Sequence, residues 1–379
     1  MAKIYLDNAA TTPIDPEVLK EMYRVMENFY GNPSSIHAHG REARTVVEKA
    51  RKTVAGLLKA SPAEIFFTSG GTEADNMAIR SAINDYKITH AITSKIEHHA
   101  VLHTLEALEK ASVIKLSYVQ VDEKGHVDLN HLEDLLQSNE RSLVSLMQAN
   151  NEIGTLTNIE AVGEICSRYN AIFHCDTVQT MGHYLHDLQK LKVHFITCAA
   201  HKFHGPKGVG FLYVNPAIKI NPLIYGGSQE RNMRGGTENL YGIAGLAKAL
   251  EIAYTNMEEH HQYIQGLKRY MKEQLEKEIP GISFNGDTDP DKSLYTVLNV
   301  SFPEMDMADM LLFNMDIAGI SCSGGSACSS GTNIGSHVLE GINASPNRPA
   351  IRFSFSKLNT KEEIDYTVGK LKEAMTSLL

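Results

Sequence analysis

Residues 193–214, VHFITCAAHKFHGPKGVGFLYV, form two apolar runs on either side of a polar, glycine-containing turn that carries Lys202. Each run has the length and composition of a buried strand. Similar runs occur earlier in the chain, separated by amphipathic helical stretches, at residues 64–69, 90–95, 113–119, 143–148 and 171–176. This alternation predicts a mainly parallel sheet covered by helices, in a large domain over residues 16–255. Residues that follow such strands meet at one edge of the sheet, where ligands bind.

The rest of the chain has a different pattern, which predicts a smaller α+β domain made of residues 1–15 with 256–379. A long helical stretch is followed by short apolar runs and a final helix from about Thr360. Between them, residues 321–336 contain ten Gly or Ser among sixteen residues. This composition favours a flexible loop, and the loop contains Cys328.

Composition excludes several classes of function. The chain has 379 residues and a formal net charge of -9, with no block of Lys or Arg, so we do not expect it to bind nucleic acid. No apolar stretch approaches the roughly 20 residues that span a bilayer, and we expect a cytoplasmic protein without membrane contact. The five cysteines include no C-x-x-C pair, which argues against a disulfide framework and a zinc ribbon. Reduced thiols are therefore expected.

Asp176 and Lys202 each follow a predicted strand and are separated by 202 − 176 = 26 residues, about one helix plus one strand. A carboxylate at the sheet edge suits a cationic ring nitrogen, and the nearby amide of Gln179 suits a phenolic oxygen. A lysine that loses solvent there has a pKa lowered from about 10.4 toward about 7–8, so it becomes an amine nucleophile. Each residue alone has an ordinary alternative, Asp176 as a helix N-cap and Lys202 as a solvated cation.

Two glycine-rich turns are candidate phosphate sites. Residues 67–76, FTSGGTEADN, open a predicted helix at Thr72, whose bare amides would bind an anion, although a tight turn alone could require the glycines. Residues 226–239, GGSQERNMRGGTEN, repeat this arrangement at Thr237. His98 follows another strand and could stack on a flat cofactor or serve the structure. Together with the lysine and the carboxylate, these groups indicate a pyridoxal phosphate site.

A metal site is a competing interpretation of part of the same region. The spacing of His194, Cys198, His201 and His204 could ligate zinc. Their segment, however, begins as a buried strand, in which alternate side chains face opposite sides of the sheet. The sequence therefore does not favour a bound metal.

Several segments of the chain resemble, in order and spacing, the group I cysteine desulfurases of the class V aminotransferase superfamily. They cover nearly the whole chain: YLDNAATTP, GNPSS, TSGGTEADN, EHHAV, NNEIG, CDTVQ, HKFHGPKGVG, RGGTEN, SGGSAC and IRFS. The segment SGGSAC, which contains Cys328, is the most specific, because group II enzymes have a different, histidine-containing pattern around their cysteine. The resemblance implies the fold-type I architecture of pyridoxal phosphate transferases, a large mainly parallel domain plus a small α+β domain, and a homodimer.

The resemblance also implies roles for individual residues. Lys202 corresponds to the lysine that holds pyridoxal phosphate as a Schiff base, Asp176 to the partner of the ring nitrogen, and His98 to the residue stacked on the ring. The other implied assignments are Gln179 and Asn151 for the ring oxygen, Gly71, Thr72 and His201 for the phosphate, Thr237 for the phosphate across the homodimer, and Arg352 for the substrate carboxylate. One residue departs from the family pattern, since Ala199 stands where a phosphate-binding serine is frequent.

The implied reaction removes sulfur from L-cysteine and leaves L-alanine. Lys202 would take the α-proton, and Cys328 would attack the substrate sulfur as a thiolate to form an enzyme persulfide. Because an unperturbed thiol has a pKa near 8.5, the site must assist its ionisation, and His98 is a candidate. A sulfur-acceptor protein, by family default an iron–sulfur cluster scaffold, would then receive the sulfur. The alternatives are a class V aminotransferase and a non-catalytic scaffold that binds sulfur acceptors.

Overall fold

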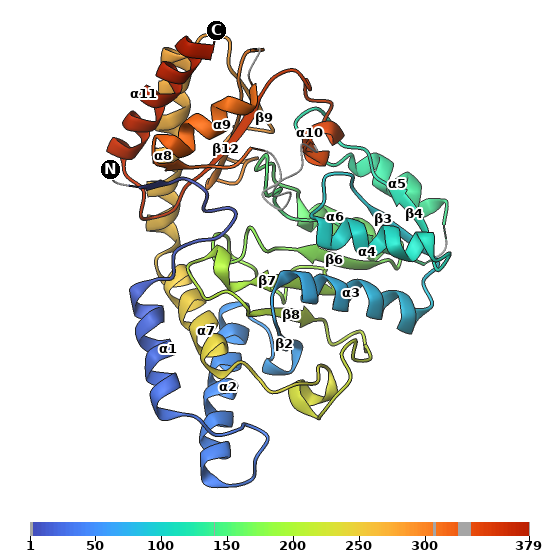
Figure 1. Ribbon diagram of the computed structural model, residues 1–379. Coiled ribbons are helices and arrows are strands. Elements are labelled where there is room, and N and C mark those ends of the chain that lie inside the picture. The colour runs from blue at the N-terminus through green and yellow to red at the C-terminus, as the bar shows by residue number, and fades with distance from the viewer. Residues whose placement is uncertain (1–2, 140, 306–307, 325–334, 379) are drawn as a thin grey trace.

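The computed structural model describes residues 3–139, 141–305, 308–324 and 335–378 (Figure 1). Cys328 and most of the predicted flexible loop lie outside the described residues. The described chain forms a large α/β unit and a smaller unit with its own antiparallel sheet. The α/β fold class expected from the sequence is therefore confirmed.

The large unit is built on a seven-stranded sheet with the strand order β2-β8-β7-β6-β5-β3-β4. Its strands are β2 (Ile65–Thr68), β3 (His90–Thr93), β4 (Lys115–Tyr118), β5 (Ser142–Ser145), β6 (Ile172–Asp176), β7 (Phe195–Ala199) and β8 (Gly210–Val214). Among these strands, β8 pairs antiparallel with β2 and β7, whereas the other pairs are parallel. The sheet is mainly parallel, as predicted, and β8 differs because the turn that carries Lys202 is too short for a crossover.

Helices cover both faces of this sheet (Figure 1). On one face, α3 (Gly71–Tyr86) and α4 (His99–Lys110) pack in a core that includes Leu143 and Phe195. On the other face, the neighbouring strand residues Val144 and Ile196 pack in a second core with four helices, α2 (Ala38–Leu57), α5 (Leu129–Gln137), α6 (Ile159–Arg168) and α7 (Leu240–Thr255). The helix α1 (Pro16–Asn28) packs on α7. Because successive strand residues face opposite sides, continuous apolar runs fill both cores.

The smaller unit contains a three-stranded antiparallel sheet, β12 (Ala350–Ser354), β10 (Val297–Ser301) and β9 (Ser283–Asn285). It packs with α8 (Met257–Glu278), α9 (Ala308–Ile317) and α11 (Lys361–Leu378), while α10 (His337–Gly341) contacts the large unit near Ile96 and Ile153. The N-terminal segment belongs to the same core through Ile4 and Leu6. The N-terminal segment also forms strand β1 (Ile4–Tyr5), which pairs in parallel with β11 (Ile320–Ser321). Residues from both ends of the chain thus build this unit.

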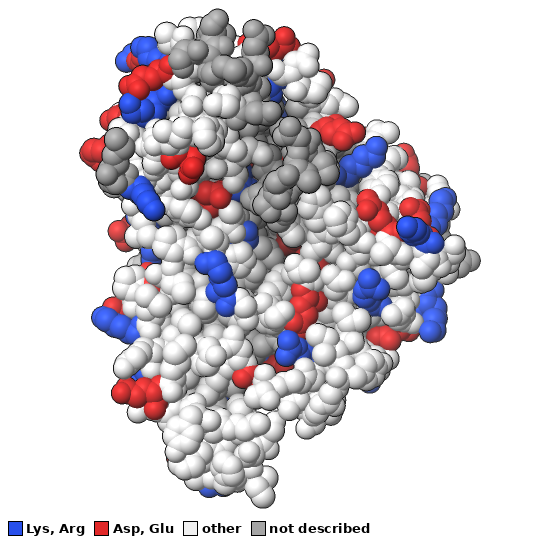
Figure 2. Space-filling model, viewed as in Figure 1, with Lys and Arg blue, Asp and Glu red and all other residues white. Residues whose placement is uncertain are grey.

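Surface features agree with the composition. On the face shown in Figure 2, acidic and basic side chains are interspersed, and the end formed by the α1–α2 connection carries few charges. No helix in the described part of the chain combines the length and the apolar character needed to cross a membrane.

Candidate active site

A cavity of about 330 Å³ lies at the carboxyl ends of β6 and β7, beside the start of α3. Nine of the residues assigned from the sequence line it: Gly71, Thr72, His98, Asn151, Asp176, Gln179, His201, Lys202 and Arg352. Thr237 lies elsewhere in this chain, exposed on the segment before α7. The structure thus gathers, around one cavity, residues that are spread over most of the sequence.

Lys202 is placed by the turn between β7 and β8. It ends the short helix η2 (Ala200–Lys202), and its Nζ donates hydrogen bonds to the carbonyl oxygens of Ala9, at 2.6 Å, and Ala10, at 2.9 Å. The turn requires glycine at position 205, because a Cβ at Gly205 would lie 2.8 Å from Cβ of Ala200. The N-terminal segment therefore fixes the amine at the cavity.

Asp176 is the last residue of β6 and is 6% exposed. Its Oδ1 accepts a hydrogen bond from the backbone N–H of Val178 at 2.8 Å, so the carboxyl caps a turn rather than a helix. Burial, followed by the neighbouring carboxyl of Asp75, raises the pKa of Asp176 to about 7. A cation beside this carboxyl would favour its ionised form. A protonated ring nitrogen therefore fits this end of the cavity.

The start of α3 forms a cradle suited to an anion. Gly70 precedes the helix with φ of 152°, and a Cβ at Gly71 would lie 2.8 Å from Cγ2 of Val178. Glycine therefore allows the backbone to approach the turn that follows Asp176. The first N–H groups of a helix, here including that of Thr72, have no intrahelical partner and bind anions well. A phosphate group fits this position.

His98 has a structural and a site-lining role at once. Its Nδ1 accepts a hydrogen bond from the backbone N–H of Ala100 at 3.1 Å and so caps α4, while the ring lines the cavity. Burial, followed by the positive charge of Lys202, lowers the pKa of His98 to about 4. The imidazole is therefore neutral near pH 7, and its proton is on Nε2 because Nδ1 is the acceptor.

Arg352 reaches the cavity from β12 and is 1% exposed. Its Nη2 donates to Oδ1 of Asp7 at 2.7 Å, and its Nη1 donates to the backbone oxygen of Asn151 at 2.9 Å. Its Nε is buried without a hydrogen-bond partner among the described residues. A buried, unpaired guanidinium N–H at a cavity is a ready donor for a substrate carboxylate.

The two amides expected at the ring oxygen, Gln179 and Asn151, both line the cavity. Nε2 of Gln179 donates to the same carbonyl oxygen of Ala9 that accepts from Lys202, at 3.1 Å. Asn151 precedes Glu152, whose buried Oε1 has no hydrogen-bond partner among the described residues. The amide of Gln179 is thus tied to the segment that holds Lys202, and the backbone of Asn151 is tied to Arg352.

Sequence reasoning left three acidic residues unassigned, Asp7, Asp75 and Glu152. Asp75 and Glu152 line the cavity, and Asp7 holds Arg352. Their positions in the sequence could have identified these three residues, because all of them lie inside segments that carry the family resemblance. The described residues contain no group of three His, Cys, Asp or Glu side chains placed to hold a metal ion.

In this protein, the strand ends of a mainly parallel sheet present a lysine and a buried carboxyl beside a glycine-headed helix. These features define an α/β enzyme of the cofactor-dependent transferase class. The family model described as aminotransferase class-V matches residues 4–367, and the chain belongs to this family, whose members are pyridoxal phosphate enzymes. The resemblance noted in the sequence is therefore confirmed.

Relatives and solved structures are similar over the whole chain. The cysteine desulfurase IscS of Dictyoglomus turgidum is 42% identical over 99% of this chain and 95% of its own length. The putative cysteine desulfurase IscS 1 of Bacillus subtilis is 41% identical over 96% of each chain. A solved NifS-like protein is 38% identical with a TM-score of 0.91 over 100% of both chains. A structure of SspA in complex with cysteine is 30% identical with a TM-score of 0.81, over 95% of this chain and 100% of that one.

Proposed function

We propose that this protein is a pyridoxal phosphate-dependent cysteine desulfurase, which converts L-cysteine to L-alanine and transfers the sulfur to Cys328. The observation that carries this proposal is the single cavity lined by Lys202, Asp176 and Arg352 beside the glycine-headed start of α3. The whole-chain similarity to proteins named cysteine desulfurase supports the choice of reaction.

The residues of the cavity suit each part of pyridoxal phosphate. Lys202 would hold it through Nζ, Asp176 would pair with its ring nitrogen, and His98 would lie against its ring. Gly71 and Thr72, with His201, would bind its phosphate at the start of α3. When bound, the cofactor supplies an electron-accepting ring that stabilises negative charge at the substrate α-carbon.

The protein's own groups would bind the substrate and handle its protons. Arg352 would hold the substrate carboxylate, using the Nε that has no other partner among the described residues. Nζ of Lys202, as a free amine, would take the α-proton of the bound substrate. The carbonyl oxygens of Ala9 and Ala10 would then stabilise the protonated amine, because they already accept hydrogen bonds from it.

Cys328 would perform the sulfur transfer, and this role rests on the sequence because the residue lies outside the described part of the chain. Its thiolate would form an S–S bond with the substrate sulfur while the C–S bond of the substrate breaks. The neutral imidazole of His98 carries its proton on Nε2 and can donate a hydrogen bond to a thiolate in the cavity, which would favour the ionised thiol. The persulfide would then pass to an acceptor protein such as an iron–sulfur cluster scaffold.

A homodimer and a cytoplasmic location complete the proposal. Five large apolar side chains are exposed on α1 and on the connection to α2: Leu19, Tyr23, Met26, Tyr30 and Ile36. An exposed apolar group of this kind is typical of a protein interface, and the same end carries few charges in Figure 2. In the dimer, Thr237 would reach the phosphate of the partner subunit. A reducing compartment would keep Cys328 as a thiol.

The test is to incubate the purified protein with L-cysteine and a reductant and to measure alanine and sulfide together. Equal amounts of both are expected. A class V aminotransferase would share the cofactor residues but would release no sulfide, and a non-catalytic scaffold would release neither product. Either result would contradict the proposal.

A further inference from the structure

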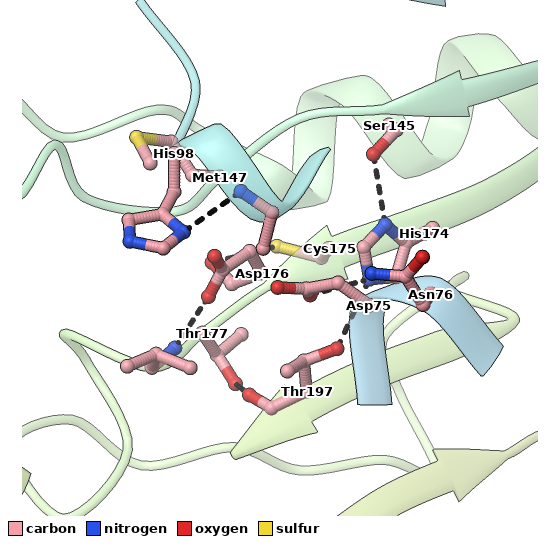
Figure 3. Close-up of polar contacts among 12 residues, drawn as sticks. Asp75, Asn76, His98, Ser145, Met147, His174, Cys175, Asp176, Thr177 and Thr197 are labelled. Carbon is pink, nitrogen blue, oxygen red and sulfur yellow. Dashed lines mark hydrogen bonds and ion pairs between the residues drawn. The ribbon is translucent and has the colours of Figure 1, made fainter. Parts of the chain in front are cut away.

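Two buried carboxyl groups, those of Asp75 and Asp176, line the cavity from different elements. Asp75 lies in α3 and is 1% exposed, and Asp176 ends β6. Figure 3 shows the two carboxyl groups pointing toward each other, with His174 on the far side of Asp75. Because both side chains are buried, two adjacent carboxylates would repel each other strongly, so the pair favours a single negative charge.

His174 lies beside Asp75 and contacts the hydroxyl groups of Ser145 and Thr197 (Figure 3). It is fully buried, and it faces the same side of β6 as Asp176 because the two are two residues apart. Its Nε2 lies 3.3 Å from Oδ1 of Asp75 and 3.0 Å from Oγ1 of Thr197, and its Nδ1 lies 2.8 Å from Oγ of Ser145. The Thr197 hydroxyl also hydrogen-bonds to Asp75. Oδ1 of Asp75 is buried without a hydrogen-bond partner among the described residues, and a proton on it would face Nε2 of His174, away from the cavity.

The other acidic groups around the pair are mostly neutral near pH 7, so the negative charge at this place is carried by Asp75 or Asp176. Glu97 lies in the segment before α4, and burial raises its pKa to about 8, so it is mostly neutral at pH 7. Burial also lowers the pKa of His174 to about 4 and raises the pKa of the Cys175 thiol, so both are neutral. Lys202 supplies positive charge from the turn after β7. Burial raises the pKa of Asp75 to about 7, as in Asp176.

We propose that Asp75 and His174 are positioning residues that hold one proton behind Asp176, so that Asp176 is the ionised member of the pair and faces the cofactor ring. This inference rests on the proposed function. The proton stays on Asp75 and is shared with Thr197 and His174, while the negative charge lies beside the ring nitrogen. One negative charge then meets one positive charge, and no buried charge is left without a partner.

The experiment measures binding of two probes to the cofactor-free protein as a function of pH, namely pyridoxal phosphate and its 1-deaza analogue, which has carbon in place of the ring nitrogen. The ratio of the two affinities reports the pairing of the ring nitrogen with Asp176. Asp75→Asn fixes the neutral form of the second carboxyl. Because the proton is proposed to stay on Asp75 while Asp176 ionises, we expect Asp75→Asn to leave both the fall of the ratio at acidic pH and its plateau unchanged. A shift of that fall by about one pH unit to lower pH, which is about a tenfold larger ratio there, would instead show that Asp75 is ionised in the wild type. The exposed Asp134→Asn is the matched control and should leave the profile unchanged.

Two further variants keep the test decisive if Asp75→Asn folds poorly. Asp176→Asn should remove the preference for the ring nitrogen at every pH. His174→Gln, which keeps a neutral hydrogen-bonding side chain, should leave the profile in place. The inference is overturned if Asp176→Asn retains the preference, if His174→Gln shifts the profile strongly, or if Asp75→Asn shifts the fall of the ratio by about one pH unit to lower pH. A wild-type protein that binds neither probe overturns the proposed function as well, and this result is read before any variant is made.

Discussion

Replacement of Arg352 by glutamine tests the recognition of the substrate carboxylate. Two N–H groups of the guanidinium are engaged by Asp7 and Asn151, while Nε has no partner among the described residues. A carboxylate that accepts from Nε and one more N–H gains two charge-assisted hydrogen bonds of about 1.5–3 kcal/mol each. Their loss corresponds to at least about 3 kcal/mol, so kcat/KM for L-cysteine should fall by about 100-fold or more.

The assay compares L-cysteine with its methyl ester, which lacks the negative charge, by measuring sulfide release in the presence of a reductant. Arg352→Gln should change kcat/KM for the ester only a few-fold, because the ester never used the full interaction. Arg168→Gln, which alters an exposed arginine paired with Glu133, is the control. Equal losses for acid and ester, with cofactor content and melting temperature preserved, would refute the assignment of Arg352.

Three other predictions concern the cysteines, a buried ion pair and acid stability. Cys328→Ser should still bind the cofactor but release neither alanine nor sulfide, whereas Cys322→Ser should remain active; normal turnover of Cys328→Ser would contradict the mechanism. Glu230→Gln should lower the free energy of unfolding by about 3–5 kcal/mol in urea titrations, because it removes the buried carboxylate that holds the guanidinium of Arg51 at 2.7 Å and leaves only the exposed Glu48, 3.2 Å from Nε, as an ionic partner; the double variant Arg51→Met/Glu230→Leu should recover most of this loss, and a single-variant effect below about 1 kcal/mol would refute the argument. Burial lowers the pKa to about 4 in six histidines, His98, His174, His183, His186, His201 and His204. Since they take up protons near pH 6.5 only when unfolded, the melting temperature of the cofactor-free protein should fall as the pH decreases from about 6.5 toward 4. Five described carboxyls with raised pKa, Asp75, Glu97, Glu152, Asp176 and Glu238, oppose this trend but are outnumbered by the histidines, and a melting temperature that rises on acidification would show the sign to be wrong.

The sheet and its strand-end residues could be predicted from the sequence because they follow from local pattern. Apolar runs of strand length locate β6 and β7, and the edge of a parallel sheet then brings Asp176 and Lys202 to one cavity. The antiparallel direction of β8 is a consequence of the short turn, which could also be read from the sequence. These inferences needed no knowledge of distant contacts.

Other parts of the site depend on contacts that no local pattern reveals. Arg352 meets Asp7 across 345 residues, so its place followed only from the resemblance. Asp75 lies three residues after Thr72 in the first turns of a helix, where an acidic residue is common because it complements the helix dipole. Only the packing of α3 against β6 shows that its carboxyl faces Asp176 rather than solvent.

The first residues of the chain have a consequence for the order in which the protein can be made. Ala9 and Ala10 hold the amine of Lys202, the side chain of Asn8 donates to the backbone oxygen of Ser354 at 2.8 Å, and β1 pairs with β11. A ribosome synthesises residue 8 long before residue 354. The segment around residue 8 must therefore wait, without its final partners, until residue 354 has emerged. A nascent chain that stops before residue 354 consequently lacks a finished cavity, so sulfide-producing chemistry can begin only after that residue has been added.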